Sequence, residues 1–367
     1  MSSLFEPFNL GAITLKNRVA MAPMTRSRAV DEGKADAQTA LYYTQRASAG
    51  LIISEGVAIS EQSQGYLFVP GLYTEAQVEA WRPVTESVHQ AGGRIFAQLW
   101  HVGRISHPSA RADGGAPVSS VAVQAKNSTC YGYRDDGTPG RIPPATPRAL
   151  SIAEIQQTIE DYAQAAENAI RAGFDGVEIH AANGYLIEQF INATLNTRAD
   201  RYGGATIENR ARLALEVLDA VVARIGGERT AIRFAPFGRF ADMHPFADEE
   251  QTWLYMAEQL NARTLAFVHF NNQLSGDQRC IKPDFLGRFR AAYDGVLMMA
   301  GGLNRALADS LLNEGLIDLA AFGVPYIANP DLVARMQNNW PIATPNAETI
   351  YGGGTEGYTD YPAYQSA

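Results

Sequence analysis

Cysteine and lysine are both scarce in this chain of 367 residues. The two cysteines, Cys130 and Cys280, are far apart and show no metal-ligand spacing, so we interpret them as free thiols rather than a disulfide framework. The four lysines are Lys16, Lys34, Lys126 and Lys282. The shortage of lysine limits the chemistry that the chain can perform, as argued below.

The chain also lacks an excess of positive charge and any long hydrophobic run. It has 30 Lys and Arg against 39 Asp and Glu, a net charge of −9, which gives no electrostatic support for binding nucleic acid or an anionic membrane. No run of about 18 apolar residues suggests a membrane span. The first residues have neither the basic nor the apolar part of a secretory signal. We expect a cytoplasmic protein, either a monomer or a small homo-oligomer.

What the sequence does contain is an alternation of short β-branched runs with longer helical patterns. Such runs are typical of strands in a buried parallel sheet, and we expect eight, at residues 18–22, 51–55, 94–98, 176–180, 230–234, 265–269, 296–300 and 319–322. Helices are expected at 38–49, 75–91, 152–172, 207–225, 249–262 and 305–314. Ser151, with Glu154 three residues later, marks one helix start. The pattern predicts one domain over 1–367, a single α/β (β/α)8 TIM barrel.

Two segments depart from this alternation. Residues 101–150 are rich in Gly, Pro, Ser and Thr, and they follow the third strand. A structureless loop of that length would be unusual, so we expect an inserted capping segment over the barrel mouth. Residues 340–367 show no clear periodicity, and we interpret them as a C-terminal strap across the barrel.

Barrel enzymes carry their chemistry just past the C-terminal ends of the strands. No lysine follows a predicted strand, which argues against Schiff-base chemistry. The six histidines show neither His-x-His nor His-x-x-x-His spacing, so no metal site is predicted. A glycoside hydrolase stays as an alternative, with Glu55 and Glu178 as the two carboxylates it needs. Against it, the seventh strand ends in glycine, where many glycosidases place an acid.

Glycines follow the last two strands, at Gly301, Gly302 and Gly323. Barrels commonly bind phosphate at this corner through backbone N–H groups, although glycine also serves ordinary tight turns. No G-x-G-x-x-G fingerprint follows a strand, which disfavours a tightly held dinucleotide. A mononucleotide with one phosphate fits better, and a flavin suits the neutral donors and arginine at the other strand ends.

A series of motifs in fixed order covers nearly the whole chain. They are residues 16–18 (KNR), 21–26 (MAPMTR), 43–55 (YTQRASAGLIISE), 98–104 (QLWHVGR), 173–190 (GFDGVEIHAANGYLIEQF), 201–204 (RYGG), 208–210 (ENR), 327–330 (IANP) and 351–354 (YGGG). Together they resemble the old yellow enzyme family of FMN-dependent ene-reductases. The resemblance implies FMN as cofactor and NADPH or NADH as electron donor.

The resemblance also implies roles around the flavin. Thr25 would hydrogen-bond the flavin O4, Gln98 would contact the pyrimidine edge, and Arg233 would lie near N1 and O2, where its charge favours the reduced ring. The full set implied to bind the cofactor is Pro23, Met24, Thr25, Gly56, Gln98, Arg233, Gly301, Gly302, Gly323 and Val324.

The same resemblance implies the substrate site. His180 and Asn183 would bind the substrate's carbonyl or nitro oxygen, and Tyr185 would be the proton donor to the α-carbon. Further residues implied to shape the pocket are Trp100, Tyr66 and Tyr351. The substrates would be electron-poor alkenes, namely α,β-unsaturated carbonyls, maleimides and nitroalkenes, reduced in ping-pong fashion; some relatives also reduce nitrate esters or nitroaromatics.

Other readings and departures remain. A flavin-binding protein that senses rather than turns over would not require Tyr185, and an iron–sulfur relative would require a cysteine cluster. Many members have arginine where this chain has Val324, so we expect a weaker grip on the phosphate, carried by backbone N–H groups. Residues 267–280 match no form that we can assign, and some relatives have histidine where this chain has Asn183.

Overall fold

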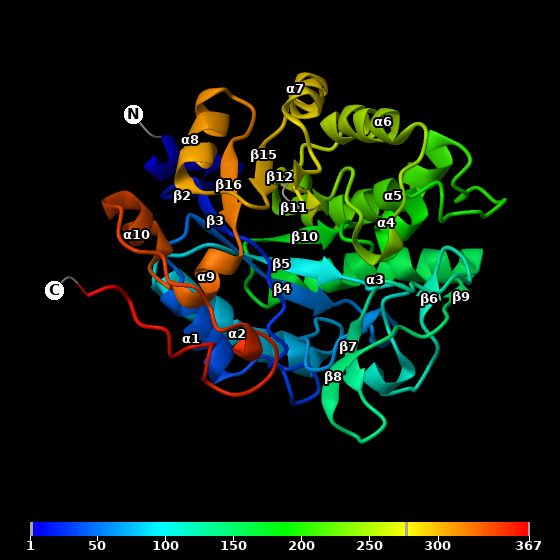
Figure 1. The fold of residues 1–367 in the computed structure, drawn as a ribbon, viewed down its shortest axis with the longest axis horizontal. Coiled ribbons are helices and arrows are strands. Elements are labelled where there is room, and N and C mark those ends of the chain that lie inside the picture. Colours follow the sequence, from blue (N-terminus) through cyan, green and yellow to red (C-terminus); the bar gives the residue numbers. More distant parts are fainter. Residues whose placement is uncertain (1–2, 276–277, 366–367) are drawn as a thin grey trace.

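The computed structural model describes residues 3–275 and 278–365, and its centre is a closed barrel of eight parallel strands (Figure 1). The strands follow one another around the barrel in the order β10, β11, β12, β15, β16, β3, β4 and β5. Their bounds are β3 (Val19–Met21), β4 (Leu51–Ala58), β5 (Ile95–Trp100), β10 (Gly176–His180), β11 (Thr230–Phe234), β12 (Phe267–Asn271), β15 (Leu297–Ala300) and β16 (Leu319–Phe322). The predicted (β/α)8 barrel is confirmed; β12 begins two residues later than expected, and β4 continues three residues further.

The strands are apolar because they are buried on both faces. Successive residues point to opposite faces of a strand, so Ala20 packs inside the barrel with Leu51 and Ile53, whereas Val19 and Ile52 pack outward, toward the helices. All eight residues of β4 are buried. A parallel barrel therefore needs nearly continuous apolar runs, which is the pattern that the sequence shows.

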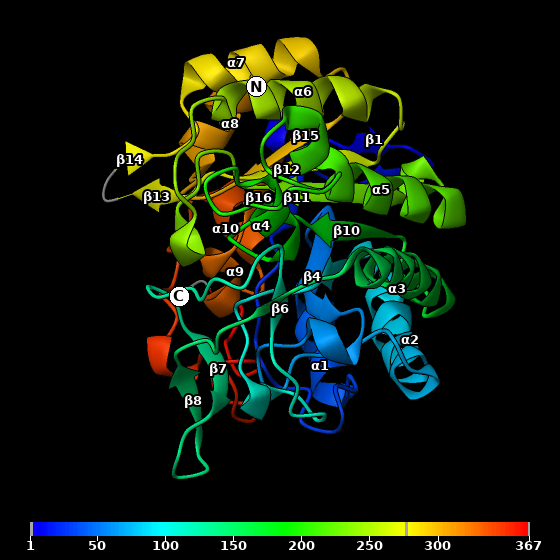
Figure 2. The same cartoon turned by 90° about the vertical axis from the view of Figure 1, so that its right-hand side faces the viewer.

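Helices surround the barrel, as Figures 1 and 2 show. The longer ones are α1 (Ala37–Gln45), α2 (Glu75–Gln90), α3 (Ile152–Arg171), α5 (Ile207–Ile225), α6 (Glu249–Asn261), α7 (Pro283–Ala292) and α8 (Arg305–Asn313). Shorter ones are α4 (Leu186–Ile191), α9 (Val324–Ala328) and α10 (Leu332–Asn338). The predicted cap forms, since the Ser151 hydroxyl accepts from the Glu154 N–H at 3.3 Å and the Glu154 carboxylate accepts from the Ser151 N–H at 2.9 Å. Helix α7 is not among the expected helices, because Gly287 in its interior weakens the helical pattern.

A hairpin of β1 (Phe8–Leu10) and β2 (Ile13–Leu15) precedes the barrel. Its residues Leu10 and Leu15 are buried and belong to the same cluster as the barrel interior. The hairpin therefore packs on the N-terminal end of the barrel. The sequence patterns did not reveal it, because strands this short carry no periodic signal.

Residues 101–150, the capping segment, contain four short strands: β6 (Val118–Ser119), β7 (Cys130–Tyr133), β8 (Pro139–Ile142) and β9 (Arg148–Ala149). Strands β7 and β8 form a hairpin that projects from the barrel (Figure 2). The segment is tied to the loop after β4, where the Leu67 N–H donates to the Tyr131 carbonyl at 2.8 Å. This contact brings the capping segment to the C-terminal side of the strands.

The tail from residue 340 onward contacts the loop after β3. The Gly352 N–H donates to the Arg26 carbonyl at 2.9 Å, and Arg28 donates to the carbonyls of Thr349 (2.9 Å), Gly354 (3.0 Å) and Glu356 (3.1 Å). Two buried arginines thus hold the tail against the loop that carries Thr25. Among the helices of the described residues, none is long and apolar enough to cross a membrane.

Candidate active site

The predicted catalytic side chains lie where β10 ends and in the turn before α4. His180 is 4% exposed and stacks on Trp100, with ring centroids 6.0 Å apart and planes 17° apart. Burial, followed by the charge of Arg233, lowers the pKa of His180 well below 6.5, so the imidazole is neutral. Its Nδ1 accepts from the Ala182 N–H at 3.3 Å. The ring proton therefore lies on Nε2, which is left to donate.

Asn183 occupies a left-handed backbone conformation, with φ of 59°, which asparagine tolerates better than most residues. Its side-chain oxygen accepts two hydrogen bonds, from the Asn271 amide at 2.7 Å and the Gln273 amide at 2.9 Å. Both donors come from residues 267–280, whose role the sequence left unassigned. Asn183 is thus held from a loop about 90 residues away in the chain.

Tyr185 lies between His180 and the residues predicted to shape the pocket. Its ring meets His180 edge to face at 5.0 Å and Trp100 at 4.8 Å. Its hydroxyl lies 3.2 Å from that of Tyr66, which donates to the Thr129 carbonyl of the capping segment at 3.3 Å. Burial, followed by the neighbouring Tyr66, raises the pKa of Tyr185 well above 10, so the phenol keeps its proton at neutral pH.

Tyr351, the pocket residue predicted on the tail, lies further out. It is 37% exposed and packs beside Tyr131 of the β7–β8 hairpin, with ring centroids 6.3 Å apart. The Arg141 guanidinium lies 5.1 Å from its ring. Tail and capping segment therefore meet at Tyr351, whereas Trp100, Tyr66, His180 and Tyr185 form one contiguous group.

A buried polar network lies below this group, on β5, β10 and β12. Gln98 donates through Nε2 to one oxygen of Glu178 at 2.8 Å, and Nδ1 of His269 lies 2.6 Å from the other. Glu178 and His269 are fully buried. The sequence motifs imply that Gln98 contacts the cofactor, but they imply no cofactor role for Glu178 or His269. The network fixes the Gln98 amide with its oxygen free to accept.

Arg233 stands beside this network on β11, in register with His180 and His269. It is 6% exposed, and its Nε has no partner in the described part of the chain. Burial lowers the pKa of Arg233, and the charge of Glu178 opposes that shift. A buried arginine with an unsatisfied donor indicates a missing acceptor, since buried charges are normally paired.

The loop after β3 is held from beneath by Glu55. Its carboxylate accepts from the backbone N–H groups of Arg26 at 3.0 Å and Ser27 at 3.3 Å. Burial raises the pKa of Glu55 to about 7. Thr25, like Pro23 and Met24, is half-buried on this loop. The loop is therefore fixed while its outer side chains stay accessible.

Glycine is sterically required around the site. A Cβ at Gly56 would lie 2.4 Å from the Trp100 ring, and one at Gly301 only 2.2 Å from the Asn272 carbonyl. Gly301 and Gly302 also have φ of +105° and +61°, which favour glycine. By contrast, a Cβ at Gly323 would meet nothing closer than the Met24 sulfur at 3.6 Å. Close approach of a ring or a backbone carbonyl explains the first two glycines, whereas a Cβ at Gly323 would make ordinary van der Waals contacts.

The corner that is predicted to bind phosphate carries no charge at Val324, which is 61% exposed at the start of α9. Arg279, on strand β14 (Gln278–Arg279), instead donates to the Gly302 carbonyl. Strand β14 pairs with β13 (Leu274–Ser275) in the loop that the motifs did not explain. A positive charge therefore reaches this corner from a neighbouring loop.

These groups fit a flavin mononucleotide. The buried unsatisfied donor on Arg233, the free oxygen of Gln98 and the glycine corner with Arg279 match a polar ring edge and one phosphate. No cluster of three or more metal-ligating side chains occurs in residues 3–275 and 278–365. The glycosidase alternative loses its carboxylates, because Glu178 is bound by Gln98 and His269 while Glu55 accepts two backbone bonds.

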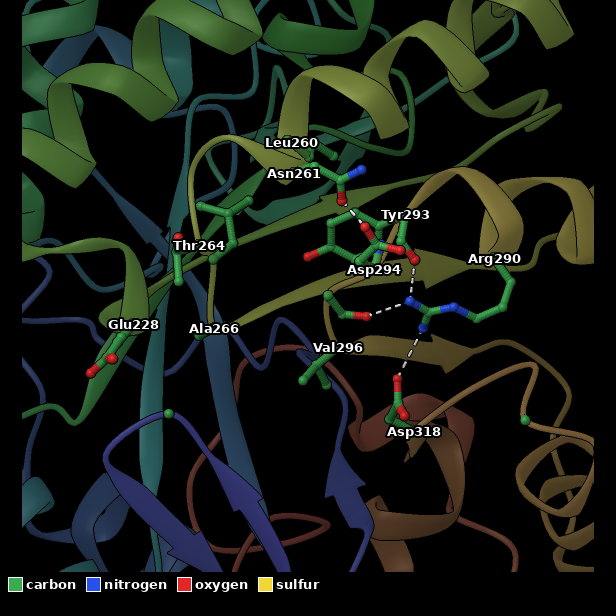
Figure 3. A pocket seen from close by; sticks show the side chains of 14 residues that line it. Glu228, Leu260, Asn261, Thr264, Ala266, Arg290, Tyr293, Asp294, Val296 and Asp318 are labelled. Atoms are coloured by element: carbon green, nitrogen blue, oxygen red, sulfur yellow. Dashed lines mark hydrogen bonds and ion pairs between the residues drawn. The ribbon is translucent and has the colours of Figure 1, made fainter.

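A hollow of about 650 Å³ lies at the opposite, N-terminal end of the barrel (Figure 3). Its Arg290 donates to Asp318 at 3.1 Å and to the Gly295 carbonyl at 2.7 Å, and the Asn261 side chain accepts from the Asp294 N–H at 3.0 Å. These polar groups are paired within the chain. The residues predicted for the site all lie away from this hollow, so we place the candidate site at the C-terminal end.

Comparison with known proteins finds relatives that cover nearly the whole chain. The model of the NADH:flavin oxidoreductase / NADH oxidase family matches residues 3–342. The 12-oxophytodienoate reductase 1 of Oryza sativa subsp. japonica is 40% identical over 365 residues, covering 98% of this chain and 92% of that protein. Morphinone reductase in complex with tetrahydroNAD is 45% identical, with a TM-score of 0.94 over 99% of this chain and 98% of that one. An old yellow enzyme homologue from Zymomonas mobilis is 41% identical, with a TM-score of 0.92 over 99% and 100%.

Proposed function

The chain belongs to the NADH:flavin oxidoreductase / NADH oxidase family, as an old yellow enzyme homologue, and from that premise we propose that it is an NAD(P)H-dependent FMN ene-reductase. Its substrates would be the activated C=C bonds of α,β-unsaturated carbonyls, maleimides and nitroalkenes. The observation that carries this proposal is the grouping of two neutral donors, His180 and Asn183, with a protonated phenol, Tyr185.

FMN would be held by groups at five strands of the barrel. Arg233 and Gln98 would contact the polar edge of the ring, Thr25 would contact O4, and the backbone at Gly301, Gly302 and Gly323 would contact the phosphate. The Arg279 guanidinium would add the positive charge that Val324 cannot supply. When bound, the flavin would supply the hydride chemistry that links oxidation of NAD(P)H to reduction of the alkene.

The chain's own side chains would polarise and protonate the alkene. The Nε2–H of His180 and the amide of Asn183 donate to the carbonyl or nitro oxygen, which draws electron density from the β-carbon. As the hydride arrives there, the π electrons move to the α-carbon, which takes the proton of the Tyr185 hydroxyl. Tyr185 then regains a proton from solvent. The raised pKa of Tyr185 keeps the phenol protonated before each cycle.

The visible spectrum of the purified protein tests this function directly. We expect a flavin spectrum that bleaches anaerobically with NADPH and returns on addition of 2-cyclohexen-1-one. Bleaching without recovery would leave a flavoprotein that does not reduce enones. A colourless protein that cannot be reconstituted with FMN would overturn the proposal altogether.

A further inference from the structure

We propose that Gln273 and Asn271 are positioning residues that fix the Asn183 amide with its nitrogen toward the substrate oxygen. The proposal rests on the proposed function for the identity of the substrate, but its geometry does not. Both residues lie in the 267–280 loop, which no family motif covers. They would turn Asn183 into an obligatory donor.

The direction of these hydrogen bonds is set by a backbone N–H group, that of Arg239. The Arg239 N–H donates to Oε1 of Gln273 at 2.9 Å. A backbone N–H can only donate, so the oxygen of the Gln273 amide must face Arg239. The nitrogen of that amide then faces the other way, where it donates to Oδ1 of Asn183 at 2.9 Å.

Asn271 completes the constraint from β12. Its Nδ2 donates to the same Asn183 oxygen at 2.7 Å. An amide oxygen has two lone pairs, and these two donors use both. The remaining hydrogen-bonding group of the Asn183 side chain is its NH2, which can only donate.

The relay is built into the packing. Gln273 is 6% exposed, and a Cβ at Gly238 would lie 2.8 Å from its amide carbon, so the glycine makes room for it. Asn183 itself is fixed in the left-handed conformation. The buried Gln273 amide, whose oxygen and nitrogen are both paired, has one favourable orientation, because the flipped form would oppose like groups.

The consequence concerns which ligands the site accepts. The Nε2–H of His180 and the NH2 of Asn183 are both donors, so the pair selects an acceptor oxygen such as a ketone or nitro group. A flipped Asn183 would present its oxygen to the ligand oxygen and repel it. Gln273 and Asn271 would thereby set substrate class without touching substrate.

Gln273→Glu tests the relay with a nearly isosteric change. One carboxylate oxygen still accepts from Arg239, but the other now faces Asn183 and attracts its NH2 group instead of its oxygen. We expect the Kd of oxidised holoenzyme for 2-cyclohexen-1-one, read from the flavin absorbance change, to rise roughly 10- to 100-fold. Gln273→Met, which is uncharged and removes both bonds, should raise it by about 3- to 10-fold.

The Asn183→Ala background separates positioning from general damage. In that background the same two substitutions should change the Kd less than about twofold, because no amide remains to be oriented. Gln64→Glu, which alters an amide bonded to Tyr73, is the matched control and should leave the Kd unchanged. FMN content and Tm of each variant check that the fold is intact.

These measurements distinguish a failure of the positioning role from a failure of the proposed ene-reductase function. A wild-type Kd for Gln273→Glu, or an equal loss with and without Asn183, would overturn the positioning role even if enones reoxidise the enzyme. Coupled losses of binding in a protein that never turns over would support the relay and refute the ene-reductase. A wild-type protein that does not bind the enone would refute both.

Discussion

The two ends of the barrel treat their buried charge in opposite ways. At the N-terminal end, Arg290 is neutralised by the chain itself, through Asp318 and the Gly295 carbonyl. At the C-terminal end, Arg233 is more deeply buried and keeps an unsatisfied Nε in the described residues. Arg290 therefore contributes to stability, whereas the Arg233 guanidinium, which makes no hydrogen bond or ion pair with the described residues, is a candidate to bind a ligand. The size of a hollow does not make this distinction.

The largest effect is expected at the phenol of the C-terminal end. Tyr185→Phe should slow reoxidation of the reduced enzyme by an enone by roughly 10²- to 10⁴-fold, since it removes the proton donor, while reduction by NADPH changes little. Stopped-flow absorbance measures both half-reactions. Tyr66→Phe is the matched control: it removes the adjacent hydroxyl and should cost less than about tenfold. Equal losses in the two variants would refute a special role for Tyr185.

Exchanging one arginine at each end tests the comparison itself. Arg233→Met should raise the dissociation constant of FMN by roughly 100-fold, because it removes the cation at the ring edge. Arg290→Gln should leave that constant unchanged and lower the free energy of unfolding by roughly 1–3 kcal/mol, because it loses an ion pair and carbonyl contacts. Flavin fluorescence on dilution and urea unfolding give the two numbers. Loss of FMN from both variants would show that the arginines at the two ends of the barrel do not differ in their role.

A buried carboxyl group at the C-terminal end, Glu188, should make the stability of the protein depend on pH. Glu188 accepts from the Gly184 N–H at 2.6 Å, and burial raises its pKa from 4.5 to about 8. The folded state therefore binds a proton that the unfolded state releases, so this stability is present below pH 4.5 and is lost as the pH rises to about 8.

Glu188→Gln, neutral at every pH, should abolish that loss. We expect it to match the wild type near pH 4 and to be more stable by up to roughly 5 kcal/mol at pH 9. Urea unfolding across this range measures the difference. A constant offset between the two proteins would show that Glu188 does not titrate as its burial implies.

The smallest effect is expected at the phosphate corner. Arg279→Gln should weaken FMN binding by about tenfold and leave riboflavin, which lacks the phosphate, unaffected. Val324→Arg should restore FMN binding in that background by placing a cation at the start of α9. Titration of deflavinated protein with each flavin measures the four constants. Parallel losses for FMN and riboflavin would mean that Arg279 acts only on the loop.

Much of the fold could be predicted from local pattern. The strands are continuous apolar runs because both faces are buried. The helix cap at Ser151 depends only on residues 151–154, so local sequence is enough to predict it. The motif around His180 and Tyr185 predicted which side chains lie together at the end of β10. The elements that the sequence patterns did not predict have weak or short patterns. Helix α7 contains an interior glycine, and the strands of the β1–β2 hairpin have three residues each.

The supporting residues of the site could not be found in this way. Gln273 meets Asn183 across 90 positions, and His269 meets Glu178 across 91, so no spacing in the sequence links them. Arg279 reaches Gly302 only because β13 and β14 turn back on the barrel. Motifs mark the groups that touch ligand, whereas the groups that orient them are chosen by the closed barrel.

The base of the β13–β14 hairpin has a consequence for how this site can change. The Cys280 N–H donates to the Gln273 carbonyl at 2.9 Å, and the Ile281 N–H donates to the Asn272 side chain at 2.8 Å. These two hydrogen bonds close the base of the hairpin next to the barrel. A longer or exchanged hairpin tip would therefore not displace Gln273. Natural variation and loop-exchange libraries can therefore alter the rim of the pocket independently of the Asn183 amide that we propose recognises the substrate oxygen.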